Sequence, residues 1–221
     1  YRQAGLLSGD YLSNHGGSAL RAQGNRITGL FMSWRSARDE KYRKVWEQQA
    51  KATTAMGIGK GGEKGWDQFW MYGLAAEGLF NYFQATEDME AAKAGALAAD
   101  SLMFCDVNKT MGKGPRGEYN NLAGFTVPVF GYAYELTGDA KYLRHGIKRL
   151  EITANASPGR SKSFAQHSRI SPQFLYYLAA DYAPPKPVLG TKAAADPVAD
   201  ALKESPAEAA PAKKPADVGA M

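Results

Sequence analysis

Three segments of this chain align without gaps, and their spacing limits the possible folds more than any other feature of the sequence. They read GLFMSWRSARDEKY, GLFNYFQATEDMEA and VFGYAYELTGDAKY and cover residues 29–42, 78–91 and 129–142. Each has an aromatic residue at its sixth position and an aspartate at its eleventh, namely Asp39, Asp88 and Asp139. A shorter fourth copy, SPQFLYYLAAD, ends at Asp181. A period of about 50 residues is typical of an array of helical hairpins.

Each repeat has the pattern of a helix, a tight turn and a second helix. Apolar residues recur at three- and four-residue spacing, which favours one face of an α-helix, in Trp70, Leu74, Ala75, Leu79, Tyr82 and Phe83. The aspartate that closes the segment can accept hydrogen bonds from the free N–H groups of the next helix. That next helix is more charged, as in KYRKVWEQQAKA. We therefore predict an all-α fold of repeated antiparallel helical hairpins, with the apolar first helices inside.

The segment YELTGDAKYL (residues 134–143), which closes an aromatic-rich helix, resembles the hairpin signature of the (α/α) toroids of polysaccharide lyases and glycoside hydrolases. The resemblance covers roughly residues 20–183. It implies a carbohydrate-active enzyme in a periplasmic or extracellular setting. Such toroids need more hairpins to close than this chain supplies, and LLSGDYL (Leu6–Leu12) reads like the end of another hairpin. We expect a preceding N-terminal part, or another chain, to complete the toroid.

The composition changes at Pro184. Residues 184–221 contain seven of the eleven prolines, eleven alanines and no aromatic residue. Such a segment buries too little apolar surface to offset the entropy lost on ordering. We predict a helical-hairpin domain over residues 1–183 and a disordered, flexible tail over residues 184–221.

The long loops of the array would meet at one end of it. These are residues 8–20, 57–66, 106–121 and 155–168, whereas the opposite turns are as short as TEDME and TGDAK. Long polar loops on one side mark the side that carries function. Basic residues outnumber acidic ones in them, and the chain has a net charge of +5. An ordinary solvated loop face would also explain this, but the excess favours an anionic polysaccharide or oligosaccharide as the partner.

The loops and the helix starts beside them contain the residue types that β-elimination on a uronate requires. Lyases of this general fold, by resemblance, neutralise the carboxylate, remove the proton beside it and expel the 4-linked sugar. Histidine can take up a proton near neutral pH, and tyrosine can donate one. The catalytic candidates are His15, Tyr119 and His167. The substrate-binding candidates, of types that neutralise a carboxylate or stack on a sugar, are Arg21, Asn25, Trp66, Asn120 and Arg169.

Two alternatives remain open at this level. A glycoside hydrolase would need two carboxylates across the scissile bond, for which Asp67 and either Glu118 or Asp106 are candidates. A non-catalytic helical array could instead bind a glycan or a protein within a larger assembly. Convergence of His15, Asn120 and His167 around one cleft would favour an enzyme.

Other classes of site find little support. The run GIGKGGEKG does not fit the phosphate-binding loop pattern, and the net charge is too mild to indicate nucleic-acid binding. No apolar stretch is long enough to predict a membrane span. His15 and His167 have no nearby cysteine or cluster of carboxylates, so we expect no metal and no cofactor. The single cysteine, Cys105, lies in an apolar helical stretch and is expected to be a buried, inert thiol.

Overall fold

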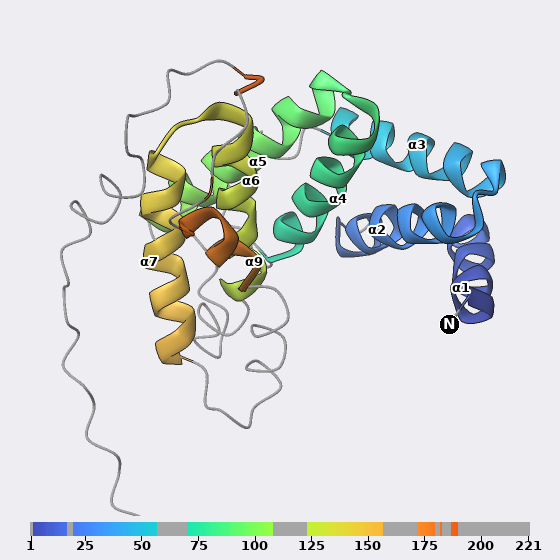
Figure 1. Ribbon diagram of the computed structural model, residues 1–221, viewed down its shortest axis with the longest axis horizontal. Helices are drawn as coiled ribbons and strands as arrows, with labels where there is room; N and C mark the ends of the chain where they lie inside the picture. Colours follow the sequence, from blue (N-terminus) through green and yellow to red (C-terminus); the bar gives the residue numbers. More distant parts are fainter. Residues whose placement is uncertain are drawn as a thin grey trace, which may run out of the picture.

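A computed structural model of the chain describes residues 2–16, 20–56, 70–107, 123–156, 172–179, 182 and 187–189. All regular structure in these residues is helical, which confirms the all-α prediction for them (Figure 1). The longer helices are α1 (Arg2–Asn14), α2 (Leu20–Ala37), α3 (Glu40–Ala55), α4 (Trp70–Thr86), α5 (Met89–Val107), α6 (Val127–Thr137) and α7 (Lys141–Ala156). Three short helices are η2 (Ala123–Phe125), α9 (Pro172–Leu175) and η3 (Tyr176–Leu178). None of the helices in these ranges has the length and apolar character needed to cross a lipid bilayer.

The connections α2–α3, α4–α5 and α6–α7 share one backbone geometry. In each, a residue with positive φ donates its N–H to the carbonyl oxygen of the aromatic residue four positions earlier, at 2.7 Å. The pairs are Arg38 with Trp34, Glu87 with Phe83, and Gly138 with Tyr134. The bond satisfies a carbonyl that the end of a helix would otherwise leave free, and the positive φ turns the chain sharply. Gly138, with φ of 71°, is the residue type best suited to that conformation.

The aspartate after each turn caps the following helix, as the sequence predicts. Asp39 Oδ1 accepts a hydrogen bond from the backbone N–H of Lys41 at 2.9 Å. Asp139 Oδ1 accepts one from Lys141 at the same distance, and Asp88 Oδ1 accepts from Glu90 at 3.0 Å. The three aspartates thus bind N–H groups that have no partner within their own helix.

The first helices of neighbouring pairs, α2 with α4 and α4 with α6, meet at corresponding positions. A Cβ added at Gly24 of α2 would lie 2.6 Å from the backbone of Leu74 in α4, and one at Gly78 would lie 3.0 Å from Ile27. Phe80 of α4 stacks on Tyr132 of α6 with ring centroids 4.3 Å apart. Contacting residues are thus separated by about one repeat, so corresponding parts of neighbouring repeats meet.

The aromatic residues of α2, α3 and α4 form the centre of the core. Trp46 of α3 is fully buried, and its ring lies 5.4 Å from that of Trp34 and 5.0 Å from those of Phe31 and Tyr82. Aromatic side chains bury large apolar areas, and offset or edge-on contacts add to this stabilisation. The indole of Trp46 therefore joins three helices.

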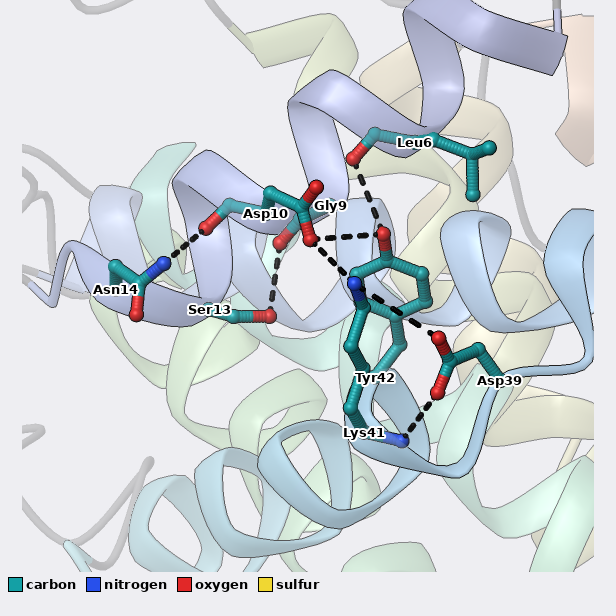
Figure 2. Close-up of polar contacts among 8 residues, drawn as sticks. All are labelled: Leu6, Gly9, Asp10, Ser13, Asn14, Asp39, Lys41 and Tyr42. Atoms are coloured by element: carbon teal, nitrogen blue, oxygen red, sulfur yellow. Dashed lines mark hydrogen bonds and ion pairs between the residues drawn. The ribbon is translucent and has the colours of Figure 1, made fainter.

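A polar cluster bonds the start of α3 to α1 (Figure 2). The hydroxyl of Tyr42 donates to Asp10 Oδ1 at 3.0 Å, and Lys41 Nζ lies 2.7 Å from the same oxygen. The hydrogen bond from Lys41 is the main cause of the lowered pKa of the Asp10 carboxyl, and the hydrogen bond from Tyr42 adds to it. The same interactions raise the pKa of Lys41. The cluster holds Asp10 in its ionised form between the two helices.

The same cluster recurs between α5 and α7. The hydroxyl of Tyr142 donates to Asp100 Oδ1 at 2.9 Å, and Lys141 Nζ lies 3.0 Å from that oxygen. In both clusters the lysine ammonium lies 4.7 Å from the ring centroid of the adjacent tyrosine. Asp100 on α5 therefore makes the contacts that Asp10 makes on α1.

The short helices at the C-terminal side dock on α6 and α7 at two glycines. A Cβ at Gly146 of α7 would overlap the ring of Phe174, and one at Gly131 of α6 would overlap the ring of Tyr177. Both aromatic rings are buried. The absence of a side chain at these two positions therefore allows α9 and η3 to approach the helices closely.

Residues 187–189, which belong to the segment predicted to form a flexible tail, contact α6. The N–H of Leu189 donates to the carbonyl oxygen of Leu136 at 2.9 Å. The Leu189 side chain packs against a small cluster that includes Phe80 and Leu136. Residues 190–221 lie outside the described residues.

Candidate functional site

His15 follows the last turn of α1, and its side chain is exposed. Its Nδ1 lies 2.9 Å from the carbonyl oxygen of Tyr11, and the two rings stack with centroids 4.1 Å apart. Because a carbonyl oxygen only accepts, Nδ1 carries the proton in this hydrogen bond. In the neutral ring Nε2 then has the free lone pair, so His15 can accept a proton there.

Arg21 and Asn25 lie in the first two turns of α2, and both side chains are exposed. Since Arg21 and Asn25 are four positions apart, they share one side of the helix. The adjacent Arg26 fixes this junction, donating from Nε to the Leu12 carbonyl at 2.7 Å and from Nη2 to that of Ser13 at 3.1 Å. The structure thus places three of the eight predicted site residues at the connection between α1 and α2.

The other predicted site residues lie outside the described part of the chain. These are Tyr119 and His167, proposed as catalytic, and Trp66, Asn120 and Arg169, proposed to bind substrate. The carboxylate candidates Asp67 and Glu118 also lie outside it, whereas Asp106 belongs to the last turn of α5.

A second group of polar residues, which the sequence interpretation missed, surrounds Glu135 on α6. Tyr177 of η3 donates to Glu135 Oε2 at 3.0 Å, and the side chain of Gln84 on α4 also bonds to this carboxyl group. Burial raises the pKa of Glu135, and the hydrogen bonds from Tyr177 and Gln84 oppose this shift. A carboxyl group that is partly removed from water among tyrosines is suited to hold or donate a proton.

Tyr132 lies near two carboxylates of different helices. Burial is the main cause of its raised pKa, and the charges of Glu77 on α4 and Glu135 on α6 add to it. Its hydroxyl donates to Gln173 Oε1 at 3.1 Å. Carboxylates from α4 and α6 are thus close enough to influence one tyrosine.

The sequence contains one signal for Glu135 that could have identified it. The seventh position of the repeat holds Arg35, Gln84 and Glu135, which are all polar. In the structure Gln84 and Glu135 are bonded to each other, and Tyr177 extends the chain of contacts. This polar position of the repeat is therefore the sequence signal for Gln84 and Glu135.

No group of three or more His, Cys, Asp or Glu side chains in the described ranges is arranged to hold a metal ion. The described residues contain two candidate sites. One is the connection between α1 and α2, where His15, Arg21 and Asn25 lie, and the other is the Glu135 group between α4, α6 and η3. No protein-family model matches the chain, and no curated protein or solved structure is significantly similar to it.

Proposed function

We propose that this chain is part of a carbohydrate-active (α/α) toroid that degrades an anionic, uronate-containing polysaccharide by β-elimination. The observation that carries the proposal is the state of His15. Its Nδ1 is occupied by the Tyr11 carbonyl, so Nε2 is free to take up a proton, and Arg21 and Asn25 follow in the next helix. A histidine of this kind can abstract a proton, and an arginine and an asparagine can neutralise the carboxylate next to it.

The repeated geometry of the helix pairs supports the toroid. Each of the three turns contains the same kind of backbone hydrogen bond and is followed by an aspartate cap, and α2 and α4, like α4 and α6, are in contact at corresponding positions. A toroid of this kind would require neighbouring first helices to meet in this way. A secreted or periplasmic location accompanies this proposal by resemblance.

In the proposed reaction the C5–H bond of the uronate breaks and its proton moves to His15 Nε2. Arg21, Asn25, Asn120 and Arg169 would stabilise the charge that develops on the carboxylate. The electron pair forms the C4–C5 double bond, and the C4–O bond to the leaving sugar breaks. Tyr119 or His167 would donate a proton to the leaving oxygen, and Trp66 would stack on a sugar ring.

Glu135 favours hydrolysis as a second candidate reaction. A general acid for glycoside cleavage needs a raised pKa, and burial raises that of Glu135. Glu77 would supply the second carboxylate, since its charge and that of Glu135 both act on Tyr132. Asp67, Glu118 and Asp106 remain candidates for the same role.

The test is incubation of the protein with pectate, alginate and hyaluronan while ultraviolet absorbance and reducing ends are measured. A rise in absorbance from the unsaturated uronate supports β-elimination, and His15→Ala should abolish it. Gln48→Ala, an exposed substitution on α3, is the matched control and should leave the rate unchanged. New reducing ends without absorbance, lost in Glu135→Gln, would favour hydrolysis. Absence of both with all substrates would favour a non-catalytic array that binds glycan or protein.

A further inference from the structure

The α9–η3 segment, residues 172–178, is held on α6 and α7 by two buried rings and by polar contacts. The rings of Phe174 and Tyr177 lie where a Cβ of Gly146 or of Gly131 would be. Because a segment this short buries little apolar area, its docking is less stable than that of the long helices. The polar contacts therefore have a large share in holding it.

One of these polar contacts ends on a carboxyl group. The hydroxyl of Tyr177 donates to Glu135 Oε2 at 3.0 Å. Three residues before Glu135, the hydroxyl of Tyr132 donates to Gln173 Oε1 at 3.1 Å. The Glu135 side chain is half-buried between α4, α6 and η3. Release of the segment removes the donor of Tyr177 and returns this carboxyl group to water.

The surroundings of Glu135 favour its neutral form in the docked state. Burial raises the pKa of Glu135, and the hydrogen bonds from Tyr177 and Gln84 oppose this shift without cancelling it. The other titratable groups near it are Glu77 on α4, Tyr132 and Tyr134 on α6, Tyr176 on η3, and Tyr182.

The tyrosines next to Glu135 keep their protons when the carboxyl group ionises. Burial is the main cause of the raised pKa of Tyr132, Tyr177 and Tyr182, and the charge of Glu135 adds to it in all three. Glu135 is therefore the group that changes charge where this segment contacts α6.

We propose that the α9–η3 segment is a pH-sensitive strap, which ionisation of Glu135 releases from α6. The docked carboxyl group keeps its proton to a higher pH than the released one, because water solvates the released carboxylate. Docking is therefore most favourable below the ordinary glutamate pKa and weakens as pH rises through the raised pKa. Release uncovers α6 and α7 at Gly131 and Gly146. This inference does not depend on the proposed β-elimination.

The test is hydrogen–deuterium exchange of the full chain between about pH 5 and pH 8, which lies above the ordinary glutamate pKa. Rates are corrected for the intrinsic effect of pH, and peptides from α2 and α3 report the stability of the rest of the protein. We expect exchange in the α9–η3 segment to become several-fold faster over this range, relative to α2 and α3.

Glu135→Gln keeps an acceptor for Tyr177 but cannot ionise, so exchange of its segment relative to α2 and α3 should not respond to pH. Glu151→Gln, an exposed substitution on α7, is the matched control and should respond like the wild type. Protection of α2 and α3 shows that each variant is folded.

Tyr177→Phe separates the hydrogen bond from the ionisation. It keeps the ring at Gly131 and removes the donor, so its segment should exchange faster than that of the wild type at each pH. A response to pH should remain, because Glu135 still ionises. A wild-type segment whose exchange relative to α2 and α3 is independent of pH would overturn the proposal. So would an undiminished response to pH in Glu135→Gln.

Discussion

The hydroxyl of Tyr142 donates to Asp100 across the interface of α7 and α5, at 2.9 Å. Tyr142 is buried, whereas Asp100 is half-buried. The bond fixes the start of α7 against the second helix of the preceding pair, α4–α5. Tyr42 and Asp10 make the same contact between α3 and α1 at 3.0 Å, so one kind of polar contact joins two pairs of helices in this array.

Replacement of Tyr142 by Phe should destabilise the protein. The change removes the donor to a carboxylate and leaves the ring in place, so we expect the free energy of unfolding to fall by about 1 kcal/mol. Urea denaturation followed by circular dichroism measures the loss. Tyr176→Phe, at an exposed tyrosine, is the control and should have little effect. Equal stability of Tyr142→Phe and the wild type would show that the bond contributes nothing.

Alanine at Gly131 or Gly146 should prevent the normal docking of α9 and η3. The new Cβ would overlap the ring of Tyr177 or Phe174, which must then shift. Such overpacking costs about 1–3 kcal/mol. Gly95→Ala is the matched control, because a Cβ there meets no atom within 4 Å and alanine favours a helix. Thermal unfolding should show losses in the first two variants and a small gain in the third.

Gly138→Ala and Glu87→Gly, in two equivalent turns, should have opposite effects on thermal stability. Gly138 has φ of 71°, where alanine is disfavoured by about 1 kcal/mol. Glu87 has φ of 60°, so Glu87→Gly relieves this strain and offsets the entropy that glycine loses on folding. We expect Gly138→Ala to lower the melting temperature and Glu87→Gly to leave it unchanged or raise it. The reverse order would contradict the turn geometry.

Glu135 should make stability fall as pH rises. Burial raises its pKa in the folded protein, so above the ordinary glutamate pKa the folded chain retains a proton that the unfolded chain has lost. Stability then decreases with pH up to the raised pKa and levels off above it.

Glu135→Gln removes this ionisation while keeping an acceptor for Tyr177. Its free energy of unfolding should therefore improve relative to the wild type across that pH window. Urea titrations at a series of pH values give the comparison, with the exposed Glu151→Gln as the control. If the difference in the free energy of unfolding between the wild type and Glu135→Gln does not change with pH, burial does not raise the pKa of Glu135.

The sequence predicts features that depend on neighbouring residues better than those that depend on packing. Asp39, Asp88 and Asp139 cap their helices as expected, because the capping bond joins residues only two or three positions apart. The helical class likewise follows from the local apolar period. These features need no information about distant parts of the chain.

The Glu135 group could not be predicted in the same way. Its contact with Tyr177 joins residues 42 positions apart and requires Gly131 to let the tyrosine approach. From the sequence alone, the segment around Glu135 indicates only the type of fold. The hydrogen bond of His15 to Tyr11 is a local contact at the end of a helix. The proposed catalytic role of His15, however, depends on residues of other repeats.

The most direct test of the proposed function is the mass of the oligosaccharides formed from an acidic polysaccharide in ¹⁸O-labelled water. β-Elimination leaves one product short of a water molecule and incorporates no ¹⁸O, because no water takes part in bond cleavage. The account predicts these unsaturated, unlabelled products from the wild-type protein and none from His15→Ala. Saturated products that carry ¹⁸O would show hydrolysis and contradict β-elimination, and no products from any acidic polysaccharide would contradict the proposed enzyme.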